Sequence, residues 1–254
     1  MIRESLYFSF DGRKSSDYGI LNVSISNGLY EEPFMSSRSI REIRTKYHYK
    51  PFFQGIDREP LSFTLSFAFE DTWDDKKIQE IVQWLNVDYY KPLFFSENID
   101  KVYYAMPVDD VSLIHNGLKQ GYLQLTMRCD SPYAYSHFIT SPIYDASLSD
   151  ELMITIENMG DCEIYPEIYI QKIDNGDISI FNLSNGNKET KLSNLVDGEE
   201  IYIDCENEII QTSLQNKWRY DDFNDQYLSF VYGINTLRIV GKCKLYFRYR
   251  FRFL

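Results

Sequence analysis

Aromatic rings and carboxylates are concentrated in one stretch of the chain, Q-N-K-W-R-Y-D-D-F-N-D-Q-Y at residues 215–227. Trp218 and Tyr220 stand beside the acidic pair Asp221 and Asp222. Rings that stack on sugars, next to carboxylates that bind hydroxyl groups, are typical of carbohydrate-binding surfaces. The alternative is a polar loop whose rings cover the end of a core. We favour that alternative, because aromatic side chains are more often packed than displayed.

Residues for catalysis are sparse. The three histidines, His48, His115 and His137, occur in no G-x-S-x-G or cysteine-nucleophile context. Carboxylate neighbours such as Asp221-Asp222 do not suffice, because glycoside hydrolysis needs two carboxyl groups that face each other across a cleft. We therefore expect no catalytic residues and no enzymatic activity.

Metal and cofactor sites are not indicated either. Cys129, Cys162, Cys205 and Cys243 are at least 33 residues apart, so the chain has no CxxC pair. The turn D-N-G-D at 174–177 lacks the ligand spacing of a calcium loop and its final glutamate. The chain also has no glycine-rich phosphate loop. We expect neither a metal nor a cofactor.

The last thirteen residues, K-C-K-L-Y-F-R-Y-R-F-R-F-L, carry five basic side chains in a chain of net charge −12. Such a stretch suits a nucleic-acid stripe, a membrane anchor, a strand with a charged face, or a surface for an acidic partner. Its alternation has a period of two, which predicts a strand with Arg248, Arg250 and Arg252 on its outer face. We expect this row to meet acidic side chains of the same or a neighbouring subunit. Nucleic-acid binding is disfavoured, because the rest of the chain is still more acidic and repels phosphates.

The elements that position these residues are predicted to be mostly β. Aromatics make up 16% of 254 residues, with only 12 Gly and 8 Pro. The stretch P-L-S-F-T-L-S-F-A-F-E (60–70) alternates as a half-buried strand does. After it the period changes to that of a helix, at about 73–86, with Thr72 as cap and with Ile78, Ile81, Val82 and Leu85 inward. This is the one helix we predict.

Two domains are predicted, 1–138 and 139–254, because prolines and small residues interrupt the pattern at 131–142. In the first, the Asp11-Gly12 turn predicts a hairpin between 5–10 and 18–25. In the second, short strands and frequent turns predict a β-sandwich. No window reaches the roughly 18 apolar residues of a membrane-spanning helix, so we expect no membrane insertion.

Residues 28–58 lack a continuous apolar face, which predicts an extended arm. Such an arm is hard to explain in a monomer and suits a contact with an acidic neighbouring subunit. Its candidate contact residues are Arg38, Arg41, Arg44, Lys46, Tyr47, Tyr49 and Lys50.

Three patches resemble one known family over essentially the whole chain and in the family's order. They are F-D-G-x6-Y-G-I at 10–20, the strand and helix unit at 58–85 closed by G-Y-L-Q-L-T-M-R-C-D-S-P-Y-A-Y-S at 121–136, and I-E-N-M-G-D-C-E-I-Y-P-E-I-Y-I at 156–170 with L-x-N-L-x-D-G-E-x-I-Y-I-D at 192–204 and Y-G-I-N-T-L at 232–237. Together they resemble the distal tail protein of siphoviruses, the bacteriophages with long flexible tails.

The resemblance implies an N-terminal β-sandwich domain with one helix, which forms a hexameric ring, and a galectin-like C-terminal sandwich. It implies a place at the tail tip of the virion, after synthesis in the host bacterial cytoplasm. The implied partners are the tail tube protein, the tail-associated fibre or lysin protein and, in some members, a receptor-binding protein. DNA would pass through the ring without specific binding. The alternative is a carbohydrate-binding module that recognises a cell-wall polymer through the C-terminal sandwich.

Overall fold

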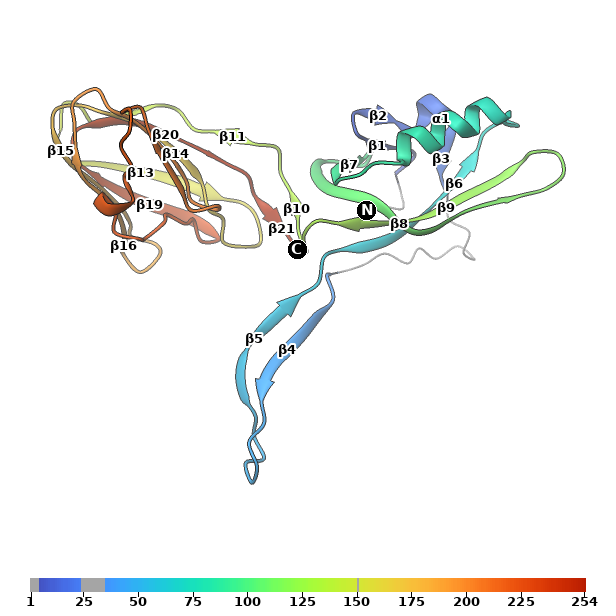
Figure 1. The fold of residues 1–254 in the computed structure, drawn as a ribbon, viewed down its shortest axis with the longest axis horizontal. Coiled ribbons are helices and arrows are strands. Elements are labelled where there is room, and N and C mark those ends of the chain that lie inside the picture. Colours follow the sequence, from blue (N-terminus) through green and yellow to red (C-terminus); the bar gives the residue numbers. More distant parts are fainter. Residues whose placement is uncertain (1–4, 24–34, 150) are drawn as a thin grey trace. The chain divides into compact units, whose positions relative to one another are not determined.

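The structure, a computed structural model, describes residues 5–23, 35–149 and 151–254. The chain forms two compact units, one ending at Tyr135 and also holding Leu254, the other comprising Ser136–Phe253. Figure 1 shows both units, which are almost entirely β-structure, with a single α-helix, α1 (Asp75–Leu85), in the described ranges. The prediction of a mostly β chain with one helix is confirmed.

The N-terminal unit is organised around one sheet with the strand order β2-β1-β7-β8-β9-β6-β3, and β10 also pairs with β8. Its strands are β1 (Phe8–Phe10), β2 (Arg13–Lys14), β3 (Ile20–Asn22), β6 (Ser62–Phe69), β7 (Lys91–Phe95), β8 (Asn98–His115), β9 (Gly121–Cys129) and β10 (Ala134–Tyr135). A 3₁₀-helix, Ser15–Tyr18, lies between β2 and β3. The predicted alternating strand is β6, where Phe63, Leu65 and Phe67 are buried.

Helix α1 is held against this sheet through Trp84. The indole ring stacks on Tyr18 at 4.6 Å and on Phe8 at 5.4 Å between ring centroids, and its N–H donates to the Phe10 carbonyl at 2.9 Å. The hydrogen bond satisfies the one polar atom of a large buried ring. Ring stacking and this hydrogen bond together hold α1 at a defined place on the sheet.

Three local predictions for this unit were wrong. The helix cap is Asp74, whose side chain accepts from the Lys77 N–H at 2.8 Å, and not Thr72. Val82 is 58% exposed, because the buried face of α1 is turned toward Trp84 and includes Ile81 and Leu85. The predicted N-terminal hairpin also does not form, since β1 pairs with β2 and β7 while β3 pairs with β6.

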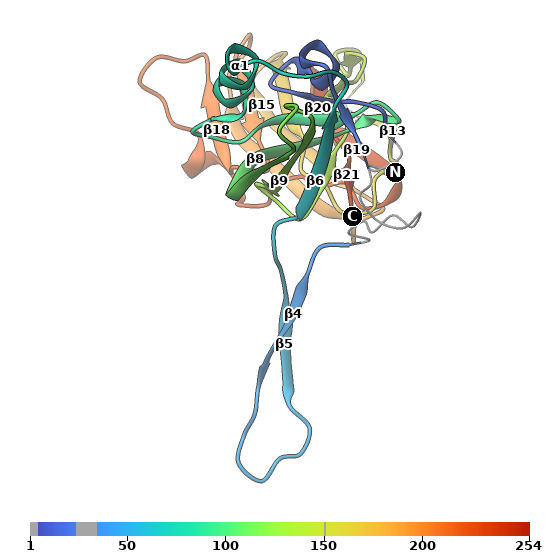
Figure 2. The same ribbon diagram turned by 90° about the vertical axis from the view of Figure 1, so that its right-hand side faces the viewer.

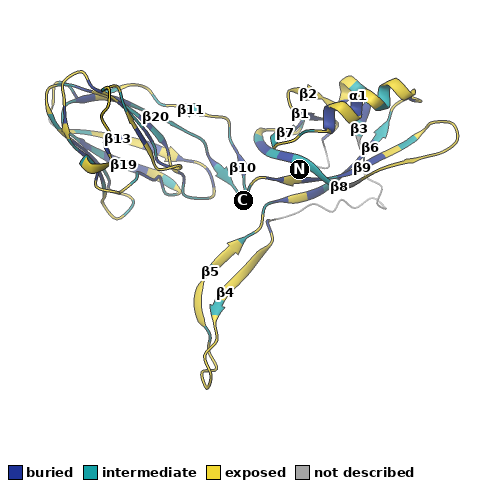
Figure 3. Ribbon diagram, in the orientation of Figure 1, coloured by how far each residue is buried: buried dark blue, intermediate teal, exposed yellow. Residues whose placement is uncertain are grey.

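The predicted arm is a hairpin of β4 (Arg38–Ile43) and β5 (Phe52–Arg58) that forms a two-stranded sheet of its own. Figure 2 shows the two strands and the loop that joins them. Figure 3 shows the hairpin as exposed along most of its length. The first part of the predicted arm, 28–34, lies outside the described residues.

The C-terminal unit is a β-sandwich of two antiparallel sheets. One has the order β11-β20-β14-β17-β18, with β12 also paired to β20, and the other has the order β13-β19-β15-β16. Their strands are β11 (Ile139–Thr140), β12 (Tyr144–Asp145), β13 (Glu151–Asn158), β14 (Glu167–Lys172), β15 (Gly176–Asn182), β16 (Lys188–Leu195), β17 (Glu200–Asp204), β18 (Ile209–Thr212), β19 (Gly233–Val240) and β20 (Cys243–Tyr249). The last strand of the chain, β21 (Arg252–Phe253), belongs to neither of these two sheets. A short 3₁₀-helix, Tyr220–Asp222, precedes β19.

The core of this unit is formed by alternate residues of both sheets. Ile168 on β14 and Phe247 on β20 are fully buried, as is Leu237 on β19 of the opposite sheet. The terminal segment follows its predicted alternation over β20, since Cys243, Leu245 and Phe247 are buried. It is not one continuous strand as predicted, because β20 ends at Tyr249 and Arg252–Phe253 form the separate strand β21. Period-two patterning therefore determines which side chains form the core and which remain for contacts.

No helix in the described ranges is long and apolar enough to cross a membrane. The four cysteines form no disulfide. Burial raises the pKa of the Cys129 thiol to about 12 and that of Cys243 to about 11, so both are protonated at neutral pH.

Candidate functional site

The β4–β5 hairpin displays apolar side chains that no core covers. The strand register places Ile40 opposite Ile56 and Ile43 opposite Phe52, with a bulge that brings Phe53 opposite Glu42. These side chains are between 43% and 67% exposed. Cross-strand pairs support the hairpin itself, but one two-stranded ribbon buries too little apolar surface to be stable alone in water.

The tip of the hairpin, residues 44–51, carries two tyrosines that are almost completely exposed, Tyr47 and Tyr49 at 91% and 105%. Tyr47 has a positive φ of 71°, a left-handed conformation that the turn requires of this residue. The ring of His48 stacks on Phe52 at 5.1 Å, and its Nδ1 lies 2.7 Å from the Lys50 carbonyl. The tip is thus an ordered turn that presents aromatic rings to solvent.

The charges of the hairpin are only partly neutralised within it. Residues 38–58 hold six Lys or Arg against two acidic residues. Arg41 pairs with Asp57 at 3.2 Å and Arg44 with Glu42 at 2.8 Å. Because both acids are used, the hairpin keeps an excess of positive charge in an acidic chain. The hairpin, residues 38–58, is the most exposed apolar and cationic element described, and we take it as the principal candidate site.

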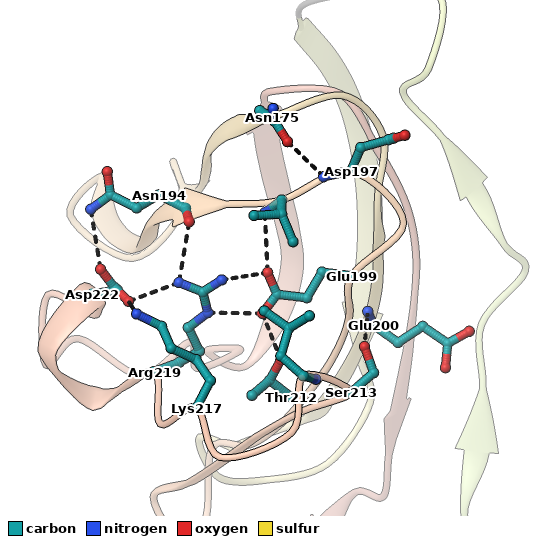
Figure 4. Close-up of polar contacts among 12 residues, drawn as sticks. Asn175, Asn194, Asp197, Glu199, Glu200, Thr212, Ser213, Lys217, Arg219 and Asp222 are labelled. Atoms are coloured by element: carbon teal, nitrogen blue, oxygen red, sulfur yellow. Dashed lines mark hydrogen bonds and ion pairs between the residues drawn. The ribbon is translucent and has the colours of Figure 1, made fainter.

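The loop of residues 215–227, for which sugar binding is the less favoured interpretation, is built around a buried ion pair (Figure 4). The Arg219 guanidinium, 2% exposed, donates from Nε and Nη2 to the two carboxylate oxygens of Glu199 at 2.8 and 2.5 Å. Glu199 also accepts from the Thr212 hydroxyl at 2.6 Å and the Val196 N–H at 3.1 Å. The remaining Arg219 nitrogen, Nη1, donates to Asp222 at 2.8 Å. Nearly every polar atom is satisfied, as a buried charge pair requires.

These contacts shift the acidities of both carboxylates. Burial alone would raise the pKa of Glu199, but the hydrogen bonds from Arg219 and Thr212 outweigh it and hold that pKa below its usual value. Hydrogen bonds from Arg219 and Asn194 lower the pKa of Asp222 to about 2. Both groups are therefore ionised at neutral pH and locked in place, which suits a structural clamp and not a general acid or base.

The Arg219–Glu199 ion pair, the clamp of this loop, also limits which groups are available to a ligand. Asp222 is occupied by Arg219, Lys217 and Asn194, and the Tyr220 hydroxyl accepts from the Ile210 N–H at 3.1 Å. Trp218, 76% exposed, and the exposed Asp221 remain available. The structure therefore brings the four predicted residues into one loop but leaves half of them for binding, and sugar binding there stays a prediction.

The terminal arginine row meets acids of its own unit. Arg248 donates to both oxygens of Glu167 at 3.0 and 3.1 Å, and Arg252 pairs with Glu206. The guanidinium of Arg248 also lies 3.9 Å from the ring centroid of Phe138, and that of Arg250 lies 5.1 Å from it. Contact of this row with a neighbouring subunit stays a prediction.

Sequence reasoning missed a row of tyrosines on the outer face of the β14 sheet. Tyr169 on β14 lies opposite Tyr246 on β20 and Tyr202 on β17. Burial, and then the Glu167 carboxylate, raise the pKa of Tyr202 to about 12, so its hydroxyl is neutral at physiological pH. The signal was present, because the segment E-I-Y-I occurs at both 167–170 and 200–203 and places each tyrosine on the outward face.

Comparison with known proteins identifies the family. The family described as "Phage tail protein N-terminal domain" matches residues 3–131, and "Phage tail C-terminal domain" matches residues 133–249. A relative from Bacillus subtilis (strain 168), the SPbeta prophage-derived uncharacterized protein YomH, is 35% identical over 254 residues, which is 100% of both chains.

Solved structures share the fold at low sequence identity. The crystal structure of the Dit (gp 19.1) protein of phage SPP1 covers 96% of this chain and 98% of its own, with a TM-score of 0.70 at 14% identity. A chain of the phage P2 baseplate in its activated conformation covers 96% of this chain and 97% of its own, with a TM-score of 0.50 at 8% identity. The two domain matches and the full-length prophage relative show that this chain belongs to the family of bacteriophage tail proteins, and its fold is that of the distal tail hub protein of SPP1.

Proposed function

We propose that this tail protein is a structural, non-enzymatic hub. Six copies would form a ring that joins the tail tube protein to the tail-associated fibre or lysin protein and leaves a central channel for DNA. The observation that carries the proposal is the β4–β5 hairpin, whose exposed apolar pairs suit burial against another copy. The fold supports it too, since the SPP1 protein of the same fold is described as a paradigm of a hub adsorption apparatus.

A ring requires a head-to-tail interface, in which the hairpin of one copy meets a different surface of the next. The free energies of apolar burial and of ion pairing indicate which hairpin side chains would stabilise that contact. Burying an isoleucine or phenylalanine side chain is worth roughly 1.5–3 kcal/mol, whereas an exposed ion pair is worth about 0–1 kcal/mol. Ile40, Phe53 and Ile56 would therefore supply most of the affinity, and the surplus positive charge would guide the approach to an acidic neighbour.

The mass of the purified chain in solution tests the ring. We expect six times the 30.1 kDa of one chain by light scattering, and a ring with a central hole by electron microscopy. A chain that stays monomeric at all accessible concentrations contradicts the hub proposal.

The variant Ile40→Asp with Phe53→Asp tests the role of the hairpin. Because both side chains are exposed within one copy, the variant should fold normally yet lose the ring and show the mass of a single chain. Leu148→Asp, at a fully exposed leucine of the C-terminal unit, is the matched control and should keep the ring. A ring that survives the double substitution would mean that another surface closes it.

A further inference from the structure

The tyrosine row on the outer face of the β14 sheet forms a continuous aromatic strip. The rings of Tyr169 and Tyr246 stack at 4.6 Å with an angle of 6° between their planes. Tyr202 lies on the other side of Tyr169, at 4.9 Å and tilted by 48°. All three side chains are partly exposed, so the strip presents ring edges and hydroxyl groups together.

A polar row runs beside the strip. Two residues further along the same strands, and on the same face, Gln171 lies opposite Lys244 and Glu200. The two rows are separated by roughly 7 Å, the distance between alternate residues of a strand. The Lys244 ammonium pairs with Asp145 at 3.5 Å. In the described part of the chain, neither the Gln171 amide nor the Glu200 carboxylate has a hydrogen-bond partner.

The two rows border a cleft of about 300 Å³, which lies at the lower end of the range for small-ligand sites. Tyr169 and Tyr246 line it on the aromatic side, and Gln171, Glu200 and Lys244 line it on the polar side. Ile143, 68% exposed, lines it as well. The cleft therefore has aromatic rings along one side and hydrogen-bonding side chains along the other, and its volume is that of a small ligand site.

The chemistry of the lining restricts the ligand. A hydrocarbon would desolvate Glu200 and Gln171 without replacing their hydrogen bonds to water, which is costly. An anion would meet the Glu200 carboxylate, while Lys244, the cation among the lining residues, is already paired with Asp145. A ligand that places apolar C–H groups against the exposed ring edges and directs hydroxyl groups to the tyrosine hydroxyls, the amide and the carboxylate satisfies both rows. We propose that this cleft binds neutral sugar residues of a surface glycan.

This inference goes beyond the hub role and does not depend on the ring. A monomer that binds glycan would overturn the hub proposal and leave the glycan site standing. A ring that binds no glycan would do the reverse. The cleft also differs from the loop that carries Trp218, so separate variants distinguish the two surfaces.

Sedimentation of the full chain with cell-wall sacculi of Bacillus subtilis tests the site, because a prophage of that organism encodes the 35% identical relative. The probes are intact sacculi, sacculi stripped of attached polymers by acid, and the released polymers. Retention by stripped sacculi would assign the sugar to peptidoglycan, whereas retention by the released polymers would assign it to those polymers. Glu200→Gln, Gln171→Ala and Tyr246→Ala should each weaken binding by about two- to tenfold, the loss expected from one hydrogen bond or one ring contact.

The controls are Tyr232→Ala, at a tyrosine outside the strip that is 72% exposed, and Glu157→Gln on β13 of the other sheet. Both should bind like the unchanged protein. Should Tyr246→Ala unfold, the two polar variants still carry the test, because their exposed, unpartnered side chains contribute little to folding. The proposal is overturned if none of the preparations binds, if the strip variants bind as tightly as the controls, or if protease treatment of the sacculi abolishes binding and so identifies a protein partner.

Discussion

At the scale of single residues, Arg219 and Glu199 form the most deeply buried charge pair described in the chain. A pair of this kind costs much to desolvate, and its value lies in holding a geometry more than in net stability. Here the geometry is that of the connection between β18 and β19, which leaves Trp218 exposed directly before the buried arginine. The exposed ring is thus carried by an anchored segment.

Breaking this pair from one side should be expensive. Glu199→Gln or Arg219→Met alone leaves the other charge without its main partner and should destabilise the surrounding segment by about 3–5 kcal/mol. The double variant should cost less than either single one, because no buried charge is then left without its partner. Hydrogen exchange of residues 194–223, followed by mass spectrometry, measures the effect. Lys244→Met, in an exposed pair with Asp145, is the control and should cost less than about 1 kcal/mol. Equal protection of residues 194–223 from exchange in all variants would mean that the Arg219–Glu199 pair does not hold this segment in place.

Asp222 predicts a pH dependence of stability. Its pKa is lowered from 3.8 to about 2 in the folded chain by hydrogen bonds from Arg219 and Asn194. A lowered folded-state pKa adds stability that is present above the unfolded value, and that stability is lost as the pH falls from about 4 to about 2. Urea unfolding across this range should therefore show a smaller acid-induced loss for Asp222→Asn than for Asp221→Asn, a neighbouring exposed carboxylate. Identical pH profiles would mean that the ion pair does not contribute.

In the β4–β5 hairpin, different side chains are expected to attract the neighbouring subunit and to hold it: charged ones attract it, and apolar ones supply the affinity. Arg38, Lys46 and Lys50 form no ion pair with any described residue. Long-range attraction raises the association rate, and salt screens it beyond roughly 10 Å at 0.1 M. The apolar pairs act only after contact. The two properties of one hairpin should therefore respond to different substitutions.

Replacing Arg38, Lys46 and Lys50 by glutamine should slow ring formation by about tenfold at low salt, with little effect at high salt and no change in the final mass. Light scattering after dilution from urea follows the assembly. Replacing Lys76, Lys188 and Lys244 removes the same charge from outside the hairpin and should leave the rate nearly unchanged. A rate that is equally slow at high salt would assign these side chains to direct contacts.

For helix α1, the sequence pattern predicted the position of the helix but not all of its buried residues. The period of 3.6 located α1 correctly, yet Val82 lies outside its buried face. Trp84 is the reason, because its ring must reach Tyr18 and Phe8 and its N–H must reach Phe10. Those partners come from β1 and from the 3₁₀-helix Ser15–Tyr18, far earlier in the chain, and a local pattern does not contain them.

Each of the two compact units has its own core, so folding of the C-terminal unit and assembly through the N-terminal unit should be independent of each other. Residues 136–254 expressed alone should fold, because the sandwich core is formed within that range, and they should be monomeric, because the hairpin lies in the other unit. Circular dichroism with cooperative urea unfolding tests folding, and light scattering tests mass. A fragment that forms rings by itself would move the assembly surface to the C-terminal unit.

Periodicity and composition were enough to predict the class of fold, the helix, the alternation along β20 and the exposed character of residues 38–58. Each depends on a period or on composition that neighbouring residues carry. The pairing of β3 with β6, the Arg219–Glu199 clamp and the tyrosine strip depend on the three-dimensional fold. These bring together residues from separate strands and loops, and a strand pattern specifies which face a side chain takes but not which strand becomes its neighbour. The candidate sugar-binding surface around Trp218 is reduced for the same reason, because Arg219, which occupies Asp222, is itself held by Glu199, twenty residues earlier in the chain.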